Sequence, residues 1–242
     1  TGTGPDLTIT NAAGATFTVS ANAEGADSAD SIAAGIIGVG ASNAAATPTL
    51  VTVTNNGTLN VTARAIDTNS SATSPSTADA FAGGIGLIGN VDGAVVTNKG
   101  TITVSAITDG NGGNADAYGI GFLGTTDSGV AGQVITINNE GGTITARTSK
   151  DAGATWQWGT AIDTENTAGE VVVNLSAAGG KVGDIFGDIE LEGDSTVNVL
   201  NGETQLDGRI VGPGQVNIAA NGTLLLENNA NGPSHVIVDD FN

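Results

Sequence analysis

The chain has 242 residues, 38 glycines, no cysteine and a formal net charge of −19. A polyphosphate partner normally requires a basic stripe, and here six Lys and Arg residues are scattered singly, which argues against nucleic acid and anionic lipid as partners. The lack of cysteine excludes disulfides, zinc–thiolate sites, thiol catalysis and iron–sulfur clusters. Aromatic residues make up only 3%, which favours a thin core of Val, Ile, Leu and Ala.

Membrane insertion by this segment is not expected, because no run approaches the roughly 18 apolar residues of a transmembrane helix. The first residue reads as a processed or trimmed start, since no leader of the charged, apolar and small-residue type begins the sequence.

Internal repeats are the strongest pattern in the sequence. Residues 51–63, 95–106 and 134–146 align well, and a looser first copy covers residues 7–21. Each copy contains a landmark asparagine, and these are spaced 44, 43 and 40 residues apart: Asn11, Asn55, Asn98 and Asn138. A repeat of this length indicates one structural unit that stacks on its neighbours.

Within each copy, apolar and polar residues alternate on both sides of an Asn-x-Gly corner, which predicts two short strands joined by a turn. Asn and Gly tolerate left-handed backbone at such a turn. A polar loop and a third element rich in Gly and Ala follow, at residues 30–37, 79–87, 116–122 and 156–162. We therefore predict an all-β fold, a right-handed parallel β-helix (β-solenoid) with three short strands per coil and loop insertions.

From about Val171 the repeat shortens, because residues 197–202 and 216–222 are related by 19 to 20 residues. The predicted organisation is a β-helix body over residues 1–170 with roughly 40-residue coils, continued over 171–242 by roughly 20-residue compact coils. The predicted inward residues are aliphatic or aromatic and recur in aligned columns: Leu7, Ile9, Phe17, Val19, Val51, Val53, Leu59, Val61, Ile102, Val104, Ile135, Ile137, Ile144, Val197, Val199, Val216, Ile218, Leu224 and Leu226.

Residues 208–226, with their Gly-x-Gly-x-Val-x-Ile and Gly-Thr-Leu-x-Leu patterns, resemble the short coils of bacterial autotransporter passenger domains. The Asn-x-Gly-Thr-Ile/Leu-x-Val repeats at 55–61, 98–104 and 138–144 are similar to the upstream body of such passengers. The resemblance implies a β-helix at the bacterial cell surface or secreted, serving adhesion, self-aggregation or biofilm formation. It also implies a longer precursor with further repeats and an outer-membrane β-barrel.

An enzymatic function is not expected. The serine-protease signature Gly-Asp-Ser-Gly is broken at Thr196, and His235 is the only histidine available to a Ser-His-Asp triad. Asp239 and Asp240 resemble the paired carboxylates of sugar-cleaving β-helices, but no cluster of basic residues accompanies them. We predict no catalytic residues.

Threonines on the second strand of each copy should face outward and stack into ladders, which are candidates for binding: Thr16, Thr18, Thr58, Thr62, Thr101, Thr103, Thr143 and Thr145. Ice-binding proteins use Thr-x-Thr ladders on flat solenoids, and here Asn60 and Arg147 interrupt the array. A polar face that simply favours β structure is the alternative.

The two tryptophans, Trp156 and Trp158, could contact a glycan by stacking on sugar rings. The alternative is an internal aromatic stack in which Phe81, Tyr118 and Trp158 share one column.

A weak calcium candidate is the Gly- and Asp-rich loop from Asp109 to Asp116, because oxygen ligands suit a hard cation. Asp30, Asp79 and Asp116 are expected to stack from coil to coil, which keeps calcium binding open. No metal site and no cofactor are otherwise predicted.

The predicted function is that of a non-enzymatic adhesin or self-associating structural segment, whose partner is itself or another cell-surface molecule. Its contacts come from inserted loops and from Thr, Asn and Asp ladders. A self-assembling filament or surface-layer subunit is the first alternative, and a polysaccharide-active enzyme or an ice- or calcium-binding module on the same scaffold is the second.

Overall fold

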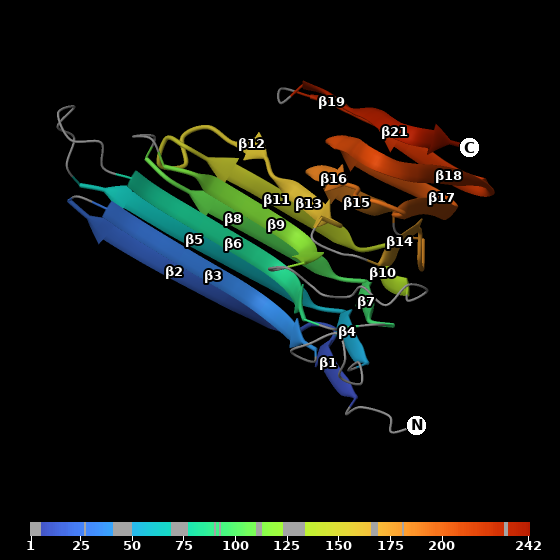
Figure 1. Cartoon of the computed structure of the whole chain (residues 1–242), viewed down its shortest axis with the longest axis horizontal. Coiled ribbons are helices and arrows are strands. Elements are labelled where there is room, and N and C mark those ends of the chain that lie inside the picture. Colours follow the sequence, from blue (N-terminus) through green and yellow to red (C-terminus); the bar gives the residue numbers. More distant parts are fainter. Residues whose placement is uncertain are drawn as a thin grey trace.

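The computed structural model describes residues 6–26, 28–40, 50–68, 77–89, 91, 93–109, 113–122, 134–165, 169–180, 182–229 and 232–242. These residues form strands that stack in parallel, in the order of the sequence (Figure 1). The chain winds as coils, and each coil contributes one strand to each of three columns. The predicted parallel β-helix is confirmed.

The first column is built from the strand that precedes each corner. It pairs Leu7 with Val51, Thr52 with Val95 and, further along, Val173 with Val197. Its strands are β1 (Leu7–Asn11), β4 (Val51–Asn55), β7 (Val95–Asn98), β10 (Val134–Glu140), β14 (Glu170–Ser176), the start of β17 (Thr196–Asp207) and the middle of β18 (Arg209–Leu226).

The second column is built from the strand that follows each corner, again in parallel register. Its strands are β2 (Thr16–Gly25), β5 (Thr58–Asp67), β8 (Thr101–Ile107), β11 (Thr143–Ser149), β15 (Gly183–Phe186) and the ends of β17 and β18.

The third column closes each coil and contains the predicted Gly- and Ala-rich elements 30–37, 79–87 and 116–122, but only residues 160–162 of the predicted element 156–162. Its strands are β3 (Ser28–Val39), β6 (Thr77–Ile88), β9 (Ala115–Phe122), β13 (Thr160–Asp163), β16 (Asp188–Glu190), the start of β18 and β21 (His235–Phe241). Outside the columns lie β12 (Gln157–Trp158), β19 (Asn228–Asn229) and β20 (Gly232–Pro233).

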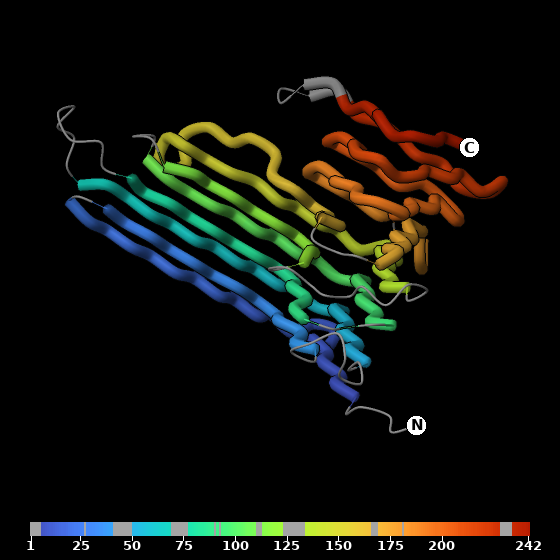
Figure 2. Tube along the Cα trace, in the orientation of Figure 1, coloured from blue at the N-terminus to red at the C-terminus, as the bar shows by residue number. Residues whose placement is uncertain are grey.

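Figure 2 shows the coils stacked in the order of the sequence, from blue at the N-terminus to red at the C-terminus, and β14 pairs with both β10 and β17 where the repeat shortens. The register of the first column makes the shortening explicit. Asn55 pairs with Asn98, 43 residues on, whereas Val197 pairs with Val216, 19 residues on.

The core is a narrow aliphatic column inside the coils. Most of the predicted inward residues are buried: Val51, Val53, Leu59, Val61, Ile102, Val104, Ile135, Ile137, Ile144, Val197, Val199 and Val216. Those of the first and last coils pack against this core but are only partly buried: Leu7, Ile9, Val19, Ile218 and Leu224. The prediction of burial is wrong for Phe17, which is 44% exposed, and Leu226, which is 41% exposed, because they lie in the end coils and only one described coil covers them.

Asparagines line the corner between the first and second columns. The side-chain Nδ2 of Asn55 donates to Oδ1 of Asn98 (2.8 Å), and that of Asn98 donates to Oδ1 of Asn139 (2.9 Å). Asn11 starts this ladder by donating to Asn55 (2.7 Å). Asn55, Asn98 and Asn139 are fully buried, so the ladder satisfies polar groups that would otherwise be costly inside the core.

Asn138, predicted from the repeats as the equivalent of Asn55 and Asn98, is not part of this ladder. Asn139 pairs with Asn98, while Asn138 faces outward and accepts a hydrogen bond from Asn174 (3.0 Å). The longer corner after Asn139 shifts the alignment by one residue, and a shift of one residue in a strand reverses the face of a side chain.

The left-handed backbone expected at the corners is found at Gly14 (φ 77°) and Gly141 (φ 65°), but not at Gly57 and Gly100, which have no positive φ. Close packing of coils explains these glycines instead. A Cβ on Gly100 would lie 1.9 Å from the carbonyl oxygen of Gly57, and one on Gly57 would lie 2.3 Å from that of Ala15. No side chain fits between the stacked corners.

Candidate functional site

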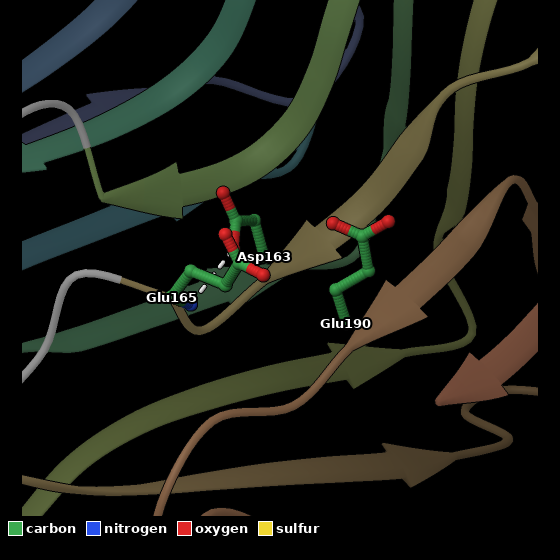
Figure 3. Close-up of side chains that lie close together, drawn as sticks. All are labelled: Asp163, Glu165 and Glu190. Atoms are coloured by element: carbon green, nitrogen blue, oxygen red, sulfur yellow. Dashed lines mark hydrogen bonds between the residues drawn. The ribbon is translucent and has the colours of Figure 1, made fainter. Parts of the chain in front are cut away.

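The third column brings three carboxylates together between its fourth and fifth coils. Asp163 ends β13 and pairs in register with Glu190 of β16, and Glu165 follows on the loop after β13. One carboxylate oxygen from each of the three residues lies within 4.8 Å of the others (Figure 3). The backbone N–H of Glu165 donates to Oδ1 of Asp163 (2.7 Å), which fixes the turn.

Burial and mutual repulsion make this cluster reluctant to ionise. Asp163 is only 5% exposed, and its pKa is raised to about 7, first by desolvation and then by the neighbouring Glu165, Glu190 and Glu192. The pKa of Glu190 is also raised, by burial and by the charges of Glu165 and Asp188. Near neutral pH the cluster can therefore hold a proton, and its three oxygen donors are of the kind that a hard cation prefers.

The repeat pattern did not predict this cluster. Glu190 lies 27 residues after Asp163 and 25 after Glu165 along the chain, and β13 carries a register shift between Thr160 and Ile162. Aligning residues 160–163 with residues 188–190 would have predicted the cluster. The register shift in β13 hides this alignment in the sequence.

The calcium candidates predicted from sequence are not assembled as expected. Asp30 does pair with Asp79, but the next coil places Asn114 beside Asp79, since the Asn114 N–H donates to its Oδ1 (2.7 Å). Asp116 instead pairs with Phe81. The predicted Asp30–Asp79–Asp116 ladder is therefore wrong at its third member, because β9 is offset by two residues.

Asp109 ends the described stretch before the loop, and its Oδ1 is buried without a hydrogen-bond partner among the described residues. Residues 110–112 of the predicted calcium loop lie outside the described residues.

The threonine ladders form on the outer side of the second column. One row stacks Thr16, Thr58, Thr101 and Thr143 in register, and the next stacks Thr18, Asn60, Thr103 and Thr145. A third row contains Ser20, Thr62, Ser105 and Arg147, and Nε of Arg147 donates to Oγ of Ser105 (3.0 Å). Asn60 and Arg147 thus interrupt the array, and the binding role of the threonines stays a prediction.

The predicted internal column of Phe81, Tyr118 and Trp158 is wrong. The Phe81 and Tyr118 rings do pack together, with centroids 5.4 Å apart, on the outer side of the third column. Trp158 packs against Phe186 instead, with centroids 5.8 Å apart. The reason is that residues 150–158 turn back over the second column, where β12 pairs antiparallel with β11.

Each tryptophan has partners within the chain. The guanidinium of Arg147 lies 4.1 Å from the ring centroid of Trp156, and Nε1 of Trp158 donates to Oδ1 of Asp207 (3.0 Å). Glycan contact by these rings remains a prediction.

The candidate acid pair near the C-terminus does not converge. Asp239 and Asp240 are neighbours on β21, and successive strand residues point to opposite faces. Asp240 accepts a hydrogen bond from Nε2 of Gln215 (2.9 Å), and hydrogen bonds from Asn242 and Gln215 lower the pKa of Asp240. His235 pairs with Arg209 on the neighbouring strand.

Comparisons with protein-family models, with curated proteins and with solved structures found no match for this chain. Among the described residues, no helix is long and apolar enough to cross a membrane.

Proposed function

We propose that the chain is a non-enzymatic, self-associating or adhesive β-helical segment at the bacterial cell surface or in a secreted protein. The observation that carries this proposal is the polar array on the second column, where two rows of short polar side chains repeat in register over four coils and a third row does so over three coils before Arg147 interrupts it. Such an array offers many weak hydrogen bonds at a constant spacing, which suits lateral contact between rods.

The net charge of the chain makes such contacts depend on salt. At −19 the copies repel one another, and repulsion between exposed charges weakens as salt shortens its range to about 10 Å at 0.1 M. Lateral association should therefore increase with salt, whereas contacts dominated by ion pairs would weaken.

Sedimentation velocity across NaCl and CaCl2 concentrations tests the proposal. The wild-type chain is expected to form larger species as salt rises. Thr101→Glu places a charge in the centre of the array and should keep the chain monomeric under the same conditions. Thr54→Glu adds the same charge on the outer side of the first column and should behave like the wild type.

A chain that remains monomeric under every condition would refute self-association. Equal effects of the two Glu variants would refute the assignment of contacts to the second column, because they would show that only net charge matters.

A further inference from the structure

The outer side of the third column contains a groove of about 330 Å³ over the first three coils, away from the threonine rows. The groove is lined by Asp30, Ile32, Asp79, Phe81, Asn114 and Asp116.

The middle of the groove is apolar and continuous. Ile32 is 73% exposed and pairs in register with Phe81 of the next coil. The Phe81 ring in turn packs on Tyr118 of the third coil, at 5.4 Å and an interplanar angle of 32°. Ile32 and Phe81 thus form an apolar platform in the groove, and the Tyr118 ring, which does not line the groove, packs against Phe81 from the third coil.

Carboxylates border this platform on each coil. Asp30 and Asp79 are register partners, and Asp116 is the register partner of Phe81. The residues that line the groove include no Lys or Arg. Negative charge beside the face of an aromatic ring is the arrangement that attracts a cation carried on an apolar stem.

We infer that this groove binds arginine side chains of an extended peptide from another protein. A guanidinium stacks on an aromatic face and makes paired hydrogen bonds to a carboxylate, and the groove offers the Phe81 ring together with a carboxylate on each of its three coils. This inference goes beyond self-association and does not depend on it.

The chain's own basic residues favour a foreign partner over a second copy. Arg64 pairs with Glu24 (3.6 Å), Lys99 pairs with Glu140 (2.9 Å), and Arg209 pairs with Asp188. Arg147 stacks on Trp156. Four of the six basic residues are therefore already engaged within one chain.

The test is a nuclear magnetic resonance titration of the isotope-labelled full chain at 0.15 M NaCl. The probe is the peptide acetyl-Gly-Arg-Gly-Arg-Gly-amide, and its control has citrulline in place of arginine, which keeps the shape but removes the charge. The arginine peptide should shift the signals of Ile32 and Phe81 first, and the citrulline peptide should bind at least tenfold more weakly.

Two variants separate the groove from the general acidity of the surface. Phe81→Leu keeps an apolar side chain but removes the ring face, and it should weaken binding about fivefold, as expected for a cation–π contact. Glu203→Gln removes one charge from an exposed residue outside the groove and should change affinity less than twofold. Shifts spread evenly over the acidic surface, or equal affinities for the wild type and Phe81→Leu, would overturn the inference.

Discussion

Replacing Asp163 by Asn should make the chain more stable at neutral and alkaline pH. The variant keeps an oxygen that can accept the hydrogen bond from the Glu165 N–H, and it removes the buried group that must ionise beside Glu165 and Glu190. The expected gain follows from the raised pKa of Asp163.

The magnitude can be worked from that pKa. A rise from 3.8 to about 7 means that the folded chain holds the proton more tightly than the unfolded chain. At about 1.4 kcal/mol per pKa unit this amounts to roughly 4 kcal/mol. Asp163 therefore contributes stability that is fully present below about pH 4 and is lost as pH rises through about 7.

The assay is urea unfolding of the wild type and Asp163→Asn at several pH values between 4 and 8.5, with a chelator present. The free energy of unfolding of the wild type should fall relative to that of the variant by roughly 4 kcal/mol over this range. Asp30→Asn, which removes an exposed carboxylate, controls for net charge. A difference between wild type and Asp163→Asn that does not change with pH would refute the reasoning.

Two further substitutions probe the corners. Asn98→Ala leaves the buried Oδ1 of Asn139 without its hydrogen-bond donor. The variant should lower the free energy of unfolding, measured by urea titration, by about 2 to 4 kcal/mol. A loss below about 0.5 kcal/mol would contradict a structural role for the asparagine ladder. Gly100→Ala places a methyl group against the Gly57 carbonyl and should cost about 1 to 3 kcal/mol or more, measured as a lower melting temperature. An unchanged melting temperature would mean that the corners are not in contact.

The sequence predicted the stacked strands because period-2 alternation and recurring landmarks survive differences in loop length. Val53, Leu59 and Val104 recur at equivalent points and are all buried. Most of the aliphatic core could therefore be predicted from the alternation and the repeats alone.

The strand register next to irregular corners and loops could not be predicted as well as the core. One extra residue after Asn139 exchanged the inner and outer asparagines, and an offset of two residues in β9 replaced Asp116 by Asn114 beside Asp79. Such shifts depend on how each loop packs, which the repeat pattern does not encode. The return of residues 150–158 over the second column could not be predicted either, since it depends on contacts of Trp156 and Trp158 with distant residues.

The candidate carboxylate cluster was missed for the same reason. Asp163 and Glu190 belong to coils of different length, and only their pairing across the third column brings them together.

The stacking of coils can be tested most directly by disulfide crosslinking, because the chain has no native cysteine. Thr58 and Thr101 are register partners on adjacent coils, where strands lie about 4.8 Å apart, within the range that a disulfide spans. The double variant Thr58→Cys and Thr101→Cys should form an intramolecular disulfide under mild oxidation. The pair Thr58→Cys and Thr143→Cys, two coils and roughly 10 Å apart, should not. Crosslinking of the second pair without the first would contradict the parallel β-helix.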